Sequence, residues 1–228
     1  MIQLLAAAAT LLATHYGISS TPLRDWLVER IGERPYLVLY AIVALGALIW
    51  LILAYRQAPY VELWPMTVWS AWVPLLVMPF ALLLAVCGIG TLRPTSVGAP
   101  GTLQDAEPVT GILRVTRHPF MWAVALWGLA HMVPNGEAAA LVLFGIMVLL
   151  ALMGTRMIDQ KLARGRGEQW QRFAEASSNL PFGAILAGRQ RLVLPEIGWL
   201  RAGVALALYV VLLAMHPWLF GVSPFGLI

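Results

Sequence analysis

Six long apolar stretches divide this sequence and limit what it can fold into. They cover residues 2–18, 35–55, 68–90, 118–134, 138–158 and 198–220. A bilayer core about 30 Å thick is crossed by about 20 residues of apolar helix, whose backbone hydrogen bonds are all made within the segment. The pattern predicts an all-α integral membrane protein with six transmembrane helices.

The composition agrees with membrane insertion along the whole chain. Of the 228 residues, 60% are hydrophobic and 11% are charged, against roughly 45–50% and 25% in soluble domains. The apolar stretches leave no polar half, so we expect a single helical domain over residues 1–228. The one cysteine, Cys87, excludes an internal disulfide and any cysteine-rich zinc or iron–sulfur site.

Lys and Arg are confined almost entirely to alternate loops. The first, third and fifth loops, with the helix ends that flank them, hold every basic residue except Arg56. Basic residues accumulate on the cytoplasmic side of a membrane. The distribution predicts periplasmic termini and three cytoplasmic basic loops in a bacterial inner membrane. The same bias accounts for the net charge of +4 without a nucleic-acid partner.

Two of the basic loops carry further expectations. In the fifth loop, the basic residues up to Arg172 predict an amphipathic segment that lies on anionic lipid headgroups, and the apolar residues 180–186 are expected to dip into the membrane interface. The third loop, residues 91–111, is rich in Gly and Pro. It is either a solvated connector or a lid over a cytoplasmic pocket.

Four histidines are the candidate functional residues. His15, His118, His131 and His216 all lie in or at the ends of apolar stretches. Ionisable residues inside a membrane usually face the protein interior and mark function, although each of these could also form a hydrogen bond between two helices. His131 follows Trp127 by one helical turn. An imidazole among aromatic and aliphatic side chains suits an axial ligand of haem.

Other cofactor patterns are missing from the sequence. It contains no Gly-x-Gly-x-x-Gly fingerprint, no P-loop and no His-Glu-x-x-His motif. Asp and Glu are scarce in the apolar stretches, which argues against a di-iron carboxylate centre and a carboxylate proton relay. Haem is the remaining metal cofactor that histidines alone can hold in an apolar bundle, and it is therefore the predicted cofactor.

The depth of the histidines in the membrane suggests which of them lie together. His118 and His131 are separated by about 20 Å of helix and lie on roughly opposite faces of it. With alternating spans, His15 lies at the cytoplasmic end beside His118, and His131 lies at the outer end beside His216. Depth alone therefore pairs His15 with His118 and His131 with His216.

Four stretches together resemble the NnrU family of bacterial membrane proteins, which is named from denitrification and nitric-oxide metabolism. They are RVTRHPFMWAVALWGLAHMVPNG, HYGISSTPLRDWLVERIGERPYLVLY, WQRFAEASSNLPFGAI and MHPWLFGVSP. The resemblance covers nearly the whole chain. It implies a multi-pass inner-membrane protein with a role in nitric-oxide or denitrification chemistry.

The NnrU family is related to plant ζ-carotene isomerases, and this relationship implies a site. Those haem b proteins isomerise a central double bond of a carotenoid in a redox-dependent way, so an apolar, carotenoid-like substrate is implied here. Their axial ligands match His15 and His131. A cysteine of theirs that is implicated in ligand exchange matches Gly128, a departure that puts a copied ligand switch in question.

A more distant resemblance implies a different chemistry. Arg117-His118-Pro119, followed downstream by residues 167–173 and Leu180-Pro181, resembles the membrane methyltransferases that act on isoprenylcysteine and phospholipids. In that reading Arg117 and His118 bind S-adenosylmethionine at the cytoplasmic face. The acidic pair of that family is reduced here to Asp159-Gln160.

A third alternative is a non-catalytic protein that senses nitric oxide or oxygen through haem, or assists assembly. The absence of an evident acid–base pair or nucleophile inside the apolar stretches favours it. The sequence by itself names no catalytic residue.

Overall fold

The computed structural model describes residues 1–18, 21–89 and 109–225, and in these ranges it consists of helices joined by turns and loops, with no β-strand. The elements are α1 (Ile2–Leu12), η1 (Ala13–Ile18), α2 (Pro22–Ile31), α3 (Glu33–Arg56), α4 (Val68–Ile89), η2 (Gly111–Arg114), α5 (Pro119–Met132), α6 (Ala138–Ala176), α7 (Gly183–Leu186), α8 (Leu194–Ile197) and α9 (Trp199–Phe220).

Every one of the six apolar stretches forms helix, as predicted, but the stretches differ in length. Four helices, α3, α4, α6 and α9, are long and apolar enough to cross a membrane on their own. A fifth span results if Ile2–Ile18 and α2, which meet at a bend, are counted as one span. Helix α5 has only 14 residues, about 21 Å of rise. The chain is a multi-pass membrane protein with four to five such helices.

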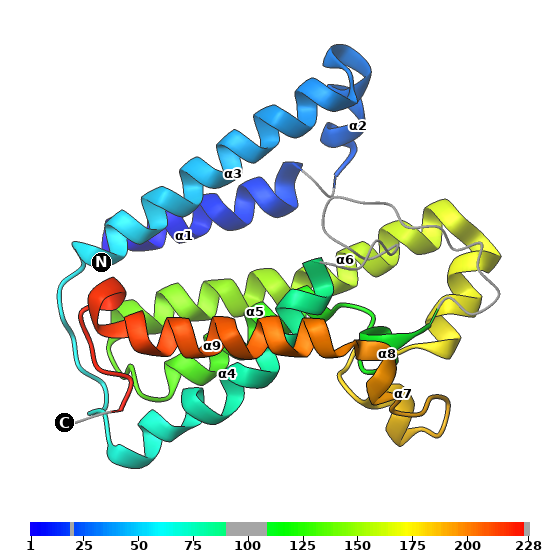
Figure 1. The fold of residues 1–228 in the computed structure, drawn as a ribbon. Helices are drawn as coiled ribbons and strands as arrows, with labels where there is room; N and C mark the ends of the chain where they lie inside the picture. The colour runs from blue at the N-terminus through cyan, green and yellow to red at the C-terminus, as the bar shows by residue number, and fades with distance from the viewer. Residues whose placement is uncertain (19–20, 90–108, 226–228) are drawn as a thin grey trace.

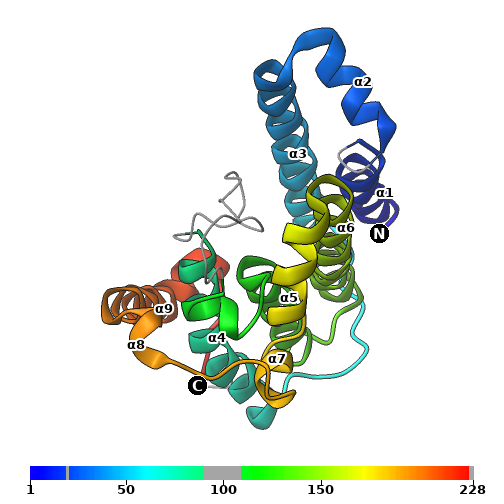
Figure 2. The ribbon, with the colours of Figure 1, turned by 90° about the vertical axis from the view of Figure 1, so that its right-hand side faces the viewer.

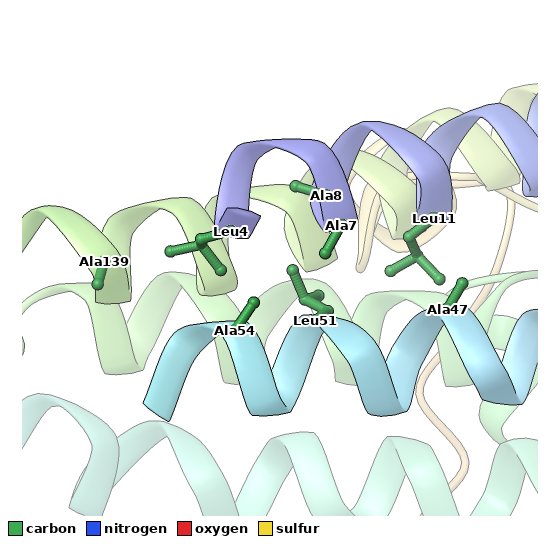
Figure 3. Close-up of a cluster of buried hydrophobic side chains, with 8 residues drawn as sticks. All are labelled: Leu4, Ala7, Ala8, Leu11, Ala47, Leu51, Ala54 and Ala139. Atoms are coloured by element: carbon green, nitrogen blue, oxygen red, sulfur yellow. The ribbon is translucent and has the colours of Figure 1, made fainter. Parts of the chain in front are cut away.

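Helix α6 is the element that the other helices share. Helices α1 and α3 pack together on one side of it, while α5 packs on another side and in turn contacts α4, which contacts α9 (Figures 1 and 2). Figure 3 shows the first of these interfaces, where small side chains let the helices approach closely. Its buried residues are Leu4, Ala7, Ala8, Leu11, Ala47, Leu51, Ala54 and Ala139.

Gly128 sets the distance between α5 and α6. A Cβ atom at this position would lie 2.7 Å from Cγ2 of Val148 and 3.1 Å from the carbonyl oxygen of Phe144. Both distances are shorter than ordinary van der Waals contact, so the absence of a side chain allows the two helices to touch. A cysteine at this position, as the family resemblance gives for the plant relatives, would need its neighbours on α6 to move.

The two ends of the bundle are different. Helix α1 begins and α9 ends at the same end (Figure 1), whereas α2, α7 and α8 lie at the opposite end. At the first end, the backbone of Leu63 donates to Gly136 (2.7 Å) and that of Ala138 donates to Val61 (2.9 Å).

Helix α6 runs well past residue 158, where we expected the fifth span to end. It continues to Ala176 because this stretch is rich in Arg, Gln and Glu, which favour helix. Gly167, at φ 48°, bends it, a conformation that glycine adopts readily. Beyond the bend, Trp170 and Phe173 are buried against Val109 and Leu113.

The first loop also differs from the expectation, because it contains α2. Pro22 occupies the first turn of this helix, where its missing N–H costs nothing. Most of the third loop, for which a connector and a lid were both considered, lies outside the described residues.

We predict that Gly128→Ala destabilises the protein by about 1–3 kcal/mol, because the added methyl group meets the Phe144 carbonyl and forces α5 away from α6. Thermal unfolding in detergent, followed by circular dichroism, measures this loss. Gly145→Ala is the matched control, since a Cβ atom there meets nothing within 4 Å. Equal melting temperatures for the two variants would contradict the proposed close contact.

Candidate functional site

The start of α5 is bound to α6 through one carboxylate, that of Asp159. Nε2 of His118 lies 2.6 Å from Oδ1 of Asp159, and Nη2 of Arg117 donates to Oδ2 at 2.5 Å. The His118 side chain is fully buried, while those of Arg117 and Asp159 are 14% and 17% exposed. A largely buried carboxylate of this kind is stable only when cations and hydrogen-bond donors surround it.

The local sequence explains why His118 and Arg117 point into the protein. Pro119 occupies the first turn of α5, and His118 is the residue that precedes the helix. The backbone N–H of His118 donates to Oγ1 of Thr116 at 3.2 Å. The guanidinium of Arg117 also lies over the ring of Trp170, 5.6 Å from its centroid, beyond the bend in α6.

A second polar group, centred on Asn179, completes this arrangement. Its side-chain amide donates to Oγ1 of Thr155 at 2.9 Å and its Oδ1 accepts from Nε1 of Trp122 at 3.2 Å. Its carbonyl accepts from Oγ1 of Thr116 at 2.6 Å. The loop after α6 is thereby joined to both α5 and α6.

Arg114 forms a parallel attachment to the segment before α9. Its Nε and Nη2 donate to the two carboxylate oxygens of Glu196 at 2.8 and 2.9 Å, and its Nη1 donates to Gln190 at 2.6 Å. The guanidinium, with the N–H of Gly111, lowers the pKa of the Glu196 carboxyl from 4.5 to about 2. The bidentate geometry is the strong form of this ion pair.

These contacts bear directly on the methyltransferase reading. Arg117 and His118, the residues assigned to S-adenosylmethionine, are both bound to Asp159, and the His118 ring has no exposed surface. The cluster as it stands joins helices, because each of its cations is directed at a carboxylate of the same chain.

His15 lies in an unusual piece of helix. Residues Ala13–Ile18 are π-helical, a conformation that is rare and often occurs at functional sites. Nδ1 of His15 lies 2.9 Å from the carbonyl oxygen of Leu11, and the ring meets Tyr40 edge-on with centroids 5.8 Å apart. Because a carbonyl oxygen only accepts, Nδ1 carries the proton and Nε2 carries the lone pair.

His131 repeats this arrangement on α5. Its Nδ1 lies 2.8 Å from the carbonyl oxygen of Trp127, four residues earlier. Its ring packs against those of Trp127 and Phe144, at centroid distances of 5.7 and 5.5 Å. The proton is again on Nδ1. Histidines that bind metals commonly donate their other N–H to a backbone carbonyl, which fixes the tautomer and the ring.

His216 is at the end of α9, and its surroundings differ. Its Nδ1 lies 2.9 Å from the carbonyl oxygen of Val222, six residues later, in the turn after the helix. Its ring packs against Phe220 with centroids 4.8 Å apart. His216 and His131 lie within electrostatic range of each other.

Contacts on α6 show at which level the other histidines lie. His131 meets Phe144, and His118 meets Asp159. The hydroxyl of Tyr16, the neighbour of His15, lies 3.1 and 2.8 Å from the carbonyl oxygens of Leu149 and Leu150. At 1.5 Å per residue, that hydroxyl is about 8 Å along α6 from the level of Phe144 and about 14 Å from Asp159. Its level is nearer to the His131 contact than to the His118 contact.

The roles of several residues in these sites are not evident from the sequence. Asp159 was considered only as the remnant of an acidic pair, although it is the one carboxylate between residues 138 and 167 and therefore a natural partner for a basic motif. Asn179, Tyr16 and Tyr40 were not singled out. In the part of the chain that the structure describes, no three His, Cys, Asp or Glu side chains converge as a metal site.

Comparisons with known proteins give the same family as the sequence motifs. The family described as NnrU protein matches residues 3–224. The chain is 33% identical over 189 residues to the chloroplastic 15-cis-zeta-carotene isomerase of Arabidopsis thaliana and 29% identical over 180 residues to that of Zea mays. These matches cover 80% and 78% of this chain and 49% of each relative, so the chain spans about half their length. No solved structure matches significantly.

We predict that Asp159→Asn costs about 3 kcal/mol of stability, because it leaves Arg117 and His118 without their shared carboxylate. Chemical denaturation in mixed micelles measures the change. Glu175→Gln removes an exposed carboxylate from the same helix and is expected to change stability by less than about 0.5 kcal/mol. If the two variants unfold alike, Asp159 does not hold this end of the bundle.

We predict that Glu196→Gln lowers the melting temperature at neutral pH and that the difference narrows in acid. The folded carboxyl has a pKa of about 2, below the usual 4.5. Its stabilising effect is therefore full above about pH 4.5 and is lost as the pH falls toward 2. Melting curves of both proteins across this range measure the effect. A difference independent of pH would show that the Arg114 ion pair is not its cause.

Proposed function

We propose that this chain, which belongs to the NnrU family, is a haem b membrane protein that isomerises a double bond of an apolar polyene. His15 and His131 are its axial ligands in this proposal. The observation that carries it is the matched state of the two imidazoles, each donating Nδ1–H to the carbonyl four residues earlier. In that tautomer Nε2 is the nitrogen through which an imidazole binds a metal.

The residues present fit haem better than another metal. Two imidazoles on separate helices in an apolar bundle are what a six-coordinate haem needs, and aromatic rings at Trp127 and Phe144 suit its flat apolar face. A mononuclear or dinuclear metal ion would need more ligands than the described residues bring together. His118 is less suited, because its Nε2 is directed at Asp159.

The orientation that we propose has six spans, with the termini in the periplasm and the basic loops in the cytoplasm of a bacterial inner membrane. The end of the bundle that carries α2, α7 and α8 is the basic one. The short helices α1 and α5 then cross with the help of their flanking turns, which a locally thinner bilayer accommodates at modest cost.

The residues around the two histidines suit isomerisation better than hydrolysis or group transfer. The stretches 2–18 and 118–134 that carry the histidines contain no Asp, Glu, Lys or Arg. Rotation about a double bond needs no such groups, because no atom is added or removed. Apolar aromatic walls hold and orient a hydrocarbon chain that enters from the lipid, while the Leu11 and Trp127 carbonyls keep both imidazoles in one tautomer.

When bound, haem b supplies an iron centre that changes oxidation state and whose ligand field the protein adjusts. This chain departs from the relatives at Gly128, which offers no side chain to such a centre. A ligand exchange through this position is therefore not open to this chain. The isomerase relatives in plants are the source of the substrate class that we propose.

We predict that the purified full-length protein, expressed with ample haem, has a Soret band and a reduced spectrum of low-spin haem b. His15→Ala and His131→Ala are each expected to lose this spectrum, while His216→Ala, a half-buried histidine at the end of α9, keeps it. Absorption spectra of the oxidised and dithionite-reduced proteins measure this. Retention of the spectrum in His15→Ala, or its loss in His216→Ala, would overturn the assigned pair.

Two further measurements separate the other readings. Calorimetric titration with S-adenosylmethionine is expected to give no heat of binding. Nitric oxide added to the reduced protein is expected to leave the absorption spectrum unchanged at first, because in this proposal His15 and His131 would both bind the iron. An immediate spectral change at equimolar gas would favour a sensing role instead of an isomerase.

A further inference from the structure

The segment that follows α6 and includes the first two residues of α9, residues 180–200, has no part in the proposed haem site. It contains the short helices α7 and α8 and lies at the end of the bundle opposite the termini (Figure 1). It runs directly into α9, a candidate membrane span. Its position along the chain therefore places it at the depth where the bilayer surface meets the protein.

The segment is held firmly to the bundle at both of its ends. The N–H of Phe182 donates to the carbonyl of Val115 at 2.8 Å, and its ring stacks on that of Phe80 at 5.7 Å. Ala184 is fully buried. At the other end, Glu196 is bound by Arg114. The outward side chains thus have a fixed direction.

Those outward side chains are large and apolar. Leu186 is 85% exposed, and Trp199 and Leu200 are each 81% exposed. The remaining exposed apolar residues of the segment are Leu180, Phe182, Leu192 and Leu194. Contiguous exposed apolar side chains beside polar ones mark a contact with a membrane or a partner. Tryptophan and leucine beside basic residues are typical of helices and turns that lie in the membrane interface.

The charge of the segment favours an anionic binding partner. Its basic side chains are Arg189 and Arg191, and Arg201 follows in the first turn of α9. Its one acidic residue, Glu196, is bound to Arg114. Arg189 donates to the carbonyl oxygens of Glu175 and Ser177 and so holds the loop. Arg191 is exposed and projects from the stretch between α7 and α8.

We propose that residues 180–200 form a binding site for anionic phospholipid. Leu186, Leu192 and Leu194 lie against the acyl chains, and Arg191 binds the headgroup phosphate. Arginine suits this role because its planar donors match phosphate oxygens. The site does not depend on haem, so the experiments that test it do not test the isomerase proposal.

The test compares lipids retained by the full-length protein. The chain is purified in detergent from mixed bilayers of phosphatidylglycerol and phosphatidylcholine, and the ratio of the two bound lipids is measured by native mass spectrometry. Arg191→Gln is expected to lower the preference for phosphatidylglycerol about fivefold, the effect of about 1 kcal/mol per basic residue. Arg56→Gln is the matched control, an exposed arginine at the opposite end of the bundle, and is expected to change nothing.

A second measurement tests the apolar half of the proposal. Hydrogen exchange of residues 185–194 in nanodiscs that contain phosphatidylglycerol is expected to be slower than in nanodiscs of phosphatidylcholine alone, and Leu186→Ser should reduce this protection. Equal effects of Arg191→Gln and Arg56→Gln on the lipid ratio would overturn the site. So would protection of this segment that appears only after a protein fraction is added, since that result indicates a protein partner.

Discussion

The structure of the basic end of this protein depends on the contacts of the Asp159 carboxylate. A carboxylate taken largely out of water destabilises a fold unless its partners are fixed in place, and here Arg117 and His118 supply them from the start of another helix. Beside them, Thr116 and Thr155 hold the loop around Asn179. At the opposite end, backbone hydrogen bonds between two turns have the equivalent role.

Helix α6 connects these polar contacts with the apolar ones. Its side chains meet α1 and α3 on one side and α5 on another, so the two histidines of the proposed site belong to different groups of helices supported by one element. Small residues decide how closely those groups approach, with Gly128 on one interface and alanines on the other. The proposed site therefore depends on the close packing at these small residues as well as on the two imidazoles.

The apolar helices could be predicted because bilayer thickness and backbone hydrogen bonding leave a chain of this composition few alternatives. The family was also evident from the four stretches that together resemble it, among them residues 114–136. The role of Asp159 could not be predicted, because this residue lies far from Arg117 and His118 in the sequence and meets them only where α5 packs on α6. The bend at Gly167 and the contact between Tyr16 and α6 likewise depend on backbone conformation and packing, which no local pattern encodes.

The π-helical turn at Ala13–Ile18 contains His15 and affects the direction of its side chain. A π-turn accommodates one residue more than an α-helical turn of the same height. Loss of a single residue from it would restore regular helix and leave the helix on either side nearly in place, so the side chains within the turn are the ones that would change direction. The direction of the His15 ring is thus a matter of residue count as well as residue type. Relatives of this chain are best aligned by the length of this turn before their histidines are compared.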